Sequence, residues 1–252
     1  MGAQFFIGQP IHFIKNVYVY PALVKDVLAD PEYARYVNVL TQSQEDIWDL
    51  FVNAKDASEV TGARDENAPT PMEFLMANCH DSPMFMAVTK KALEFFTHSS
   101  VKIIPENKMI LFTAGIENVK DVQDLPLITE DNFFEFQNLI RLAANEKPIE
   151  KPKEKEHPKI ARMKALSRYR DKIKKKNGTK DGISLDTMIC ALCCMGIGLN
   201  PLNVGEISYH SALRLFSMSR KKEKYETDVK IMTAGFGNSK IKPKDWMIEE
   251  NK

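Results

Sequence analysis

The sequence predicts a predominantly helical protein, with an α+β N-terminal domain built on a small antiparallel sheet or hairpins and a smaller all-α C-terminal domain. Three observations lead to this fold class. Short β-branched and aromatic runs alternate with helix-start signals over residues 1–145, prolines and charges fill residues 146–158, and only helical patterns follow over residues 159–252. The chain has 252 residues, 44% of them hydrophobic and 27% charged, which is an ordinary globular composition.

The first twenty residues carry three short runs typical of strands, at residues 5–7, 11–14 and 17–20. The runs are rich in Phe, Ile, Val and Tyr, and a Gly-Gln-Pro turn separates the first from the second. Pro21 fits the first turn of a helix, because its missing N–H would have no partner there. We therefore expect strands at the N-terminus, followed by a helix that begins at Pro21.

Start signals predict four more helices before residue 100. They begin at Pro31, at Ser43, at the Thr-Pro-Met-Glu capping box of residues 70–73 and at Pro83. A polar loop over residues 55–69 separates the second of these helices from the third. The positions expected to face the core are Tyr33, Tyr36, Val37, Leu40, Ile47, Trp48, Phe51, Phe85, Met86, Leu93 and Phe96.

A hairpin and a further helix complete the N-terminal part. The apolar runs at residues 101–104 and 109–112 flank a Pro-Glu-Asn-Lys turn, which is a hairpin signal. Thr129 or Asp131 is the expected cap of the helix that follows. Its apolar positions are Phe133, Phe134, Phe136, Leu139, Ile140 and Leu142.

Beyond this helix the composition changes. Residues 146–158 hold three prolines and dense charge, so they cannot build a core, and we interpret them as a linker. One helix is expected over residues 159–176, a second after Ser184, and a long third helix that the capping-box-like residues 203–206 open and Gly235 ends. The apolar positions of the long helix are Ile207, Ala212, Leu213, Phe216, Val229 and Met232.

The formal net charge of +1 hides a strong asymmetry along the chain. Residues 1–146 carry 11 basic and 21 acidic side chains, residues 147–180 carry 14 and 4, and residues 181–252 carry 10 and 9. An acidic body, a basic middle and a neutral tail indicate segments with different tasks.

The basic segment is expected to form a helix with two kinds of surface. Met163, Leu166, Tyr169 and Ile173 recur at steps of three and four residues, and such an apolar stripe favours packing on protein. The basic side chains could equally neutralise nucleic-acid phosphates or simply face solvent. Basic residues of this helix include Arg162 and Lys164, and the basic patch expected to meet a partner is Arg168, Arg170, Lys172, Lys174, Lys175 and Lys176.

The sequence contains no recognisable catalytic, metal or cofactor site. Cys190, Cys193 and Cys194 lack a second pair of ligands at zinc-finger spacing, so we interpret them as small buried residues of a helix core, with metal or redox use as the alternative. No histidine lies in a HExxH pattern, and the Gly-x-Gly pairs lack the strand-to-helix setting of a dinucleotide site. With no apolar run of about 20 residues and no secretory signal, we expect a cytoplasmic protein with reduced thiols and no membrane partner.

Three stretches resemble tail-assembly chaperones, or closely allied tail-module proteins, of phages and prophages of Gram-positive bacteria. The first is the Phe-rich helix at residues 133–141, and the second is the Pro/Lys linker that runs into the basic helix. The third is the long helix at residues 209–232, which runs into Ala234-Gly235 and then into residues 243–246. The resemblance is one of short phrases over much of the chain.

This resemblance implies a non-enzymatic protein of the host bacterial cytoplasm that binds the long tape-measure protein while the tail tube forms. The tail tube protein is a further possible partner, and self-association is compatible with the pattern. The alternative is a nucleic-acid-binding regulator that uses the basic helix 159–176, although the last two helices are about eight residues apart, against 3–4 in a helix-turn-helix. The candidate partner-binding residues are Phe133, Phe136, Arg141, Tyr169, Leu213, Phe216 and Trp246.

Overall fold

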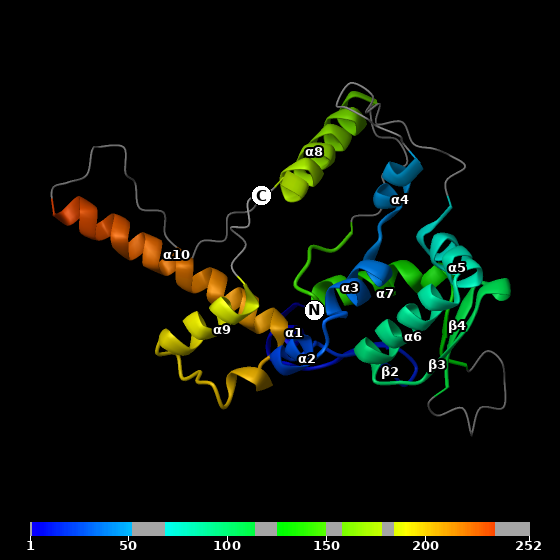
Figure 1. The fold of residues 1–252 in the computed structure, drawn as a ribbon, viewed down its shortest axis with the longest axis horizontal. Coiled ribbons are helices and arrows are strands. Elements are labelled where there is room, and N and C mark those ends of the chain that lie inside the picture. The colour runs from blue at the N-terminus through cyan, green and yellow to red at the C-terminus, as the bar shows by residue number, and fades with distance from the viewer. Residues whose placement is uncertain (1, 52–68, 114–124, 150–157, 178–183, 235–252) are drawn as a thin grey trace.

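The computed structural model describes residues 2–51, 69–113, 125–149, 158–177 and 184–234 (Figure 1). Over these residues the chain forms ten α-helices and two small antiparallel sheets, which confirms a predominantly helical α+β fold. The elements up to residue 143 are α1 (Gly2–Phe6), β1 (Ile11–Ile14), β2 (Val17–Val19), α2 (Val24–Ala29), α3 (Tyr33–Thr41), α4 (Gln44–Phe51), α5 (Pro71–Asp81), α6 (Pro83–Thr97), β3 (Val101–Ile104), η1 (Pro105–Asn107), β4 (Met109–Phe112), β5 (Leu127–Ile128) and α7 (Glu130–Ala143).

The N-terminus differs from the sequence prediction. Residues 5–7 were expected to form a strand, but Phe5 and Phe6 end the short helix α1, which places Phe5 fully inside the core. Gly8 has a φ of 78° and its N–H donates to the Phe5 oxygen, so the chain turns directly after the helix. The next two runs form the expected strands, and these pair as an antiparallel hairpin with Ile11 opposite Val19.

Most of the predicted helix starts are confirmed. Thr70 Oγ1 accepts the Glu73 N–H at 3.2 Å while Glu73 Oε2 accepts the Thr70 N–H at 3.0 Å, which is a complete capping box. Ser82 Oγ accepts the Phe85 N–H at the start of α6, and Ser43 Oγ accepts the Asp46 N–H at the start of α4. Helix α2 begins at Val24 rather than Pro21, because the Val24 N–H donates to the distant Ile207 oxygen and keeps the preceding residues extended.

The main core lies where α3, α6 and α7 pack together beside both sheets (Figure 1). Leu40, Phe96, Phe112, Phe136 and Ile140 are each completely buried there. Each such side chain contributes about 1.5–3 kcal/mol relative to an exposed position. The predicted hairpin of β3 and β4 gains a third strand, β5, with Ile110 opposite Ile128; this two-residue strand was too short to predict.

The C-terminal part contains α8 (Pro158–Asn177), α9 (Leu185–Cys194), the 3-10 turn η4 (Val204–Glu206) and α10 (Tyr209–Thr233). The long helix therefore begins five residues later than predicted. Ser208 is its cap, since Ser208 Oγ accepts the Ser211 N–H at 3.1 Å, whereas the residues from Asn203 onward form only the short turn. In the described ranges, no helix has the length and apolarity that crossing a membrane requires.

The start of α10 is joined to the N-terminal segment by hydrogen bonds. Tyr209 N–H donates to the Ala22 oxygen at 2.7 Å, and Ser208 Oγ donates to the Phe5 oxygen at 2.9 Å. Val24 is fully buried in a second core cluster together with Met188 and other side chains of α9 and α10. The division into two domains with a linker stays a prediction, but these contacts mean that any C-terminal unit is packed on residues 5–24.

Candidate functional site

The residues expected to bind a partner are not brought together by the fold. Phe136 is completely buried, and only 3% of Phe133 is exposed, so both belong to the main core. Leu213 and Phe216 are half-buried against the second core cluster. Tyr169 is half-buried on α8, and Trp246 lies outside the described residues.

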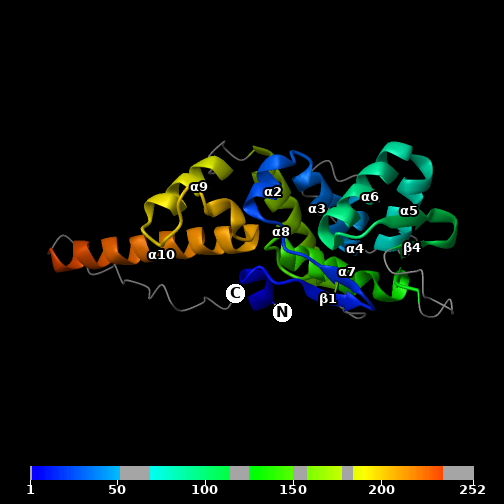
Figure 2. The same ribbon diagram turned by 90° about the horizontal axis from the view of Figure 1, so that it is seen from below.

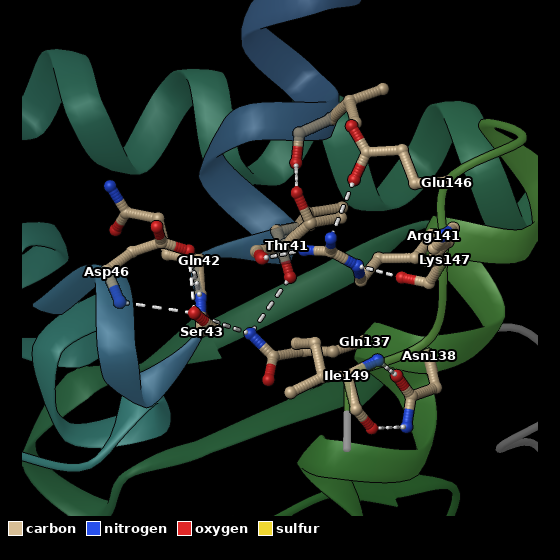
Figure 3. Close-up of polar contacts among 12 residues, drawn as sticks. Thr41, Gln42, Ser43, Asp46, Gln137, Asn138, Arg141, Glu146, Lys147 and Ile149 are labelled. Carbon is tan, nitrogen blue, oxygen red and sulfur yellow. Dashed lines mark hydrogen bonds and ion pairs between the residues drawn. The ribbon is translucent and has the colours of Figure 1, made fainter. Parts of the chain in front are cut away.

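Arg141, near the end of α7, contacts other segments of the same chain (Figure 3). Its Nη1 donates to the Thr41 oxygen at 3.0 Å, its Nε donates to the Lys147 oxygen at 2.7 Å, and its Nη2 lies 3.4 Å from Glu146 Oε2. The guanidinium therefore joins the end of α3 to the segment after α7. These contacts give Arg141 a structural role within the chain that requires no partner protein.

Two side-chain amides of α7 also bond to the backbone of neighbouring segments (Figure 3). Gln137 Nε2 donates to the Leu40 oxygen at 3.1 Å and to the Gln42 oxygen at 2.9 Å. Asn138 Oδ1 accepts the Ile149 N–H at 2.6 Å, and its Nδ2 donates to the Ile149 oxygen at 3.4 Å. The first residues of the predicted linker are thus held against α7, which composition alone did not indicate.

A pocket of about 190 Å³ opens between the first turns of α4 and α5 and the first half of α7. Its apolar lining includes Met72 and Phe134, while the carboxylates of Glu45 and Glu130 supply acidic groups. Glu130 is exposed and Glu45 is half-buried. The full lining is Ser43, Gln44, Glu45, Thr70, Pro71, Met72, Glu130, Phe133, Phe134, Gln137 and Ile149.

The basic helix α8 reaches this part of the body through one of its predicted patch residues. Arg168 Nη1 donates to Glu45 Oε2 at 2.8 Å, with about a third of each side chain exposed (28% and 39%). Arg162, Lys164 and Arg170 are exposed, as a cationic face requires. Lys172, Lys174, Lys175 and Lys176 lie on the helix, but their side chains lie outside the described part of the structure.

The apolar stripe predicted for α8 is covered by this chain only in part of its described length. Leu166 and Tyr169 are half-buried, but 70% of Met163 is exposed, and 49% of the neighbouring Ile160. The helix contacts the body near its middle turn through Arg168, and among the described side chains the half-buried apolar ones, Leu166 and Tyr169, belong to that turn. The first turns of α8 carry both positive charge and apolar side chains into solvent.

The second half of α10 carries a different apolar stripe. Met218, Tyr225, Val229 and Met232 are separated by seven, four and three residues, which places them on one side of the helix. The first three are half-exposed and Met232 is 47% exposed. Within the described residues, none of the four belongs to either core cluster. Figure 2 shows this end of α10 projecting past α9.

The interpretation of the cysteines as buried core residues is wrong for α9. Cys190 and Cys194 are exposed and Cys193 is half-buried, because α9 turns Met188 and Leu192 toward α10 instead. The spacing of apolar residues in α9 did not indicate which side of the helix is buried. Across the described residues, no group of three or more His, Cys, Asp or Glu side chains is placed to hold a metal ion.

The comparisons with known proteins add no family to this description. No family model matches the chain, and neither a curated protein nor a solved structure matches it. The structure instead adds two surfaces: the α10 stripe, of which the sequence interpretation named only Val229 and Met232 as apolar positions, and the pocket between α4, α5 and α7. The seven-residue spacing of Met218, Tyr225 and Met232 was the signal available for the first; no local signal existed for the second.

Proposed function

We propose that this protein is a non-enzymatic assembly protein that binds a helical client, and specifically a tail-assembly chaperone of a phage or prophage that binds the tape-measure protein. On this proposal it acts in the host bacterial cytoplasm. The tail tube protein and a second copy of the chain are further candidate partners. The resemblance of residues 133–141 and 209–232 to such chaperones supports the specific form of the proposal.

The observation that carries the general form is the apolar stripe on α10. Met218, Tyr225 and Met232 repeat every seven residues, as the contact residues of paired helices do. Aromatic and methionine side chains are suited to such contacts, because both bury large areas and methionine adapts to irregular surfaces. The client should therefore be a long helix that packs along the second half of α10.

A matched pair of variants tests this proposal by co-expression of the full chain with a candidate tape-measure protein from the same genome. Tyr225→Asp places a charge in the stripe, whereas Thr227→Asp places the same charge on the opposite, exposed side of the helix. A central interface aromatic contributes about 2 kcal/mol or more, so Tyr225→Asp should weaken the complex about 30-fold or more. Thr227→Asp should leave it intact.

The complex is measured by affinity purification followed by titration calorimetry. Absence of any complex with the wild-type chain, or equal affinity of both variants, would overturn the proposed function. Circular dichroism of each variant checks that α10 remains helical, so that loss of binding reports on the surface and not on folding.

The nucleic-acid alternative makes a different prediction for α8. Replacing Lys174, Lys175 and Lys176 with Glu should abolish binding to a generic duplex, and the affinity should fall steeply with salt. The ion pair of Arg168 with Glu45 favours protein contact for this helix, because it already engages a carboxylate of the body. Tight duplex binding at about 0.15 M salt that the triple change removes would favour the regulator over the chaperone.

A further inference from the structure

The pocket between α4, α5 and α7 combines an apolar lining with acidic groups. Pro71, Met72, Phe134 and Ile149 supply apolar surface at its walls. Apolar cavities of about 150 Å³ accommodate a benzene ring, so a space of about 190 Å³ suits one large apolar side chain.

One of the acidic groups already binds a cation from this chain. Arg168 of α8 donates to Glu45 at 2.8 Å, and the pair is only partly exposed. Glu130 adds a second carboxylate to the lining of the pocket, from the first turn of α7. The surrounding body is acidic as well, because residues 1–146 carry 21 acidic and 11 basic side chains.

We propose that this pocket is a docking site for a basic amphipathic helix of a partner protein, and that α8 is its competitor within the chain. The partner helix places an Arg or Lys on Glu45 and Glu130 and inserts a large apolar side chain, about one turn away, between Met72 and Phe134. Binding requires that Arg168 release Glu45. This site is separate from the α10 stripe, so its failure leaves the proposed function untouched.

The charge pattern selects this occupant over a purely apolar one. An apolar helix would bury the Glu45 carboxylate without a partner once Arg168 has left, and burial of an unpaired charge is strongly unfavourable. A basic helix replaces the lost ion pair and adds apolar contact. Replacing Arg168 by a basic residue of the partner therefore exchanges one ion pair for another. The apolar side chain that the partner inserts then determines whether binding of the partner is favoured over binding of α8.

A labelled peptide with the sequence of residues 158–177 provides a probe with this chemistry. Its affinity for the full-length chain is measured by fluorescence anisotropy. The variant Arg168→Ala frees Glu45 and should bind the probe about two- to fivefold more tightly than wild type, the range expected of a partly exposed ion pair. A peptide with Ser at positions 166 and 169 keeps the charge and should bind more weakly.

Two further variants of the chain locate the site. Glu130→Gln removes an acidic group of the pocket and should weaken probe binding about two- to fivefold, whereas Glu135→Gln, an equally exposed position of α7 outside the pocket, should not. Equal affinity of all these chains, or no probe binding to Arg168→Ala, would overturn the proposal. It would also be overturned if light scattering showed a dimer that Arg168→Ala dissociates, because a second copy would then supply the helix.

Discussion

His210 and Leu142 join the first turn of α10 to the end of α7. His210 Nδ1 lies 2.9 Å from the Leu142 carbonyl oxygen, and only 5% of the histidine is exposed. Because a carbonyl oxygen can only accept, Nδ1 carries the hydrogen. Nε2 is also buried and has no hydrogen-bond partner among the described residues. This single contact links residues 68 positions apart in the chain.

The first prediction follows from this contact. His210→Ala should lower the free energy of unfolding by about 1–3 kcal/mol, because it removes the hydrogen bond to the Leu142 oxygen together with the packing of a buried side chain. His210→Asn, whose Nδ2 can occupy the place of Nδ1, should recover part of the loss. Urea denaturation measures both, with the exposed His80→Ala as the control within about 0.5 kcal/mol of wild type. Equal stability of His210→Ala and wild type would contradict this role.

The second prediction concerns the predicted linker, much of which lies outside the described residues. Limited digestion with a glutamate-specific protease should cut first within residues 146–158, because three prolines and dense charge disfavour regular structure there. The two pieces should nevertheless elute together on gel filtration, since Ser208 and Tyr209 bond to the N-terminal segment. First cleavage within residues 71–97 or 206–234 would contradict the domain division, and separate elution would contradict the joint packing.

The third prediction concerns the capping box of α5. The hydrogen bond from Lys108, at 2.7 Å, and then the Thr70 N–H lower the pKa of Glu73 below its ordinary value. A carboxyl group with a lowered folded-state pKa stabilises the fold above the unfolded-state pKa and loses that contribution as pH falls through the folded-state pKa. The wild type should therefore exceed Glu73→Gln in melting temperature at pH 7, and the difference should shrink below about pH 4. A difference that persists undiminished at pH 3 would contradict the ion pair.

The fourth prediction distinguishes the cysteines by their exposure. Cys190 and Cys194 should react quickly with a thiol reagent in the native protein, because both are exposed on α9. Cys79 should react only on unfolding, since it is completely buried and its burial raises the pKa of its thiol, which lowers the thiolate population. Cys79→Ala should leave the fast phase unchanged; loss of that phase would contradict the structure.

The sequence alone determined most of the local structure. Capping residues such as Thr70 and Ser82 act within a few residues of themselves, so their helices begin where the sequence predicts. The β-branched and aromatic runs likewise predicted the strands at residues 11–14 and 17–20, and the apolar runs around a Pro-Glu-Asn-Lys turn predicted the hairpin at residues 101–112. Helical periodicity placed Tyr36 and Leu40 in the core. These features depend on residues that are close together in the chain, so the sequence alone is enough to predict them.

Tertiary contacts decided the rest, because they join residues that no local pattern connects. The Val24 N–H bonds to the Ile207 oxygen where α2 begins, and Ser208, the cap of α10, bonds to the Phe5 oxygen. Packing against α10 determines which side of α9 is buried and leaves Cys190 exposed. The pocket that Glu45 and Glu130 help to line forms only because α4, α5 and α7 meet. Periodicity determines that a helix has two sides, but only the positions of its neighbours determine which side is covered.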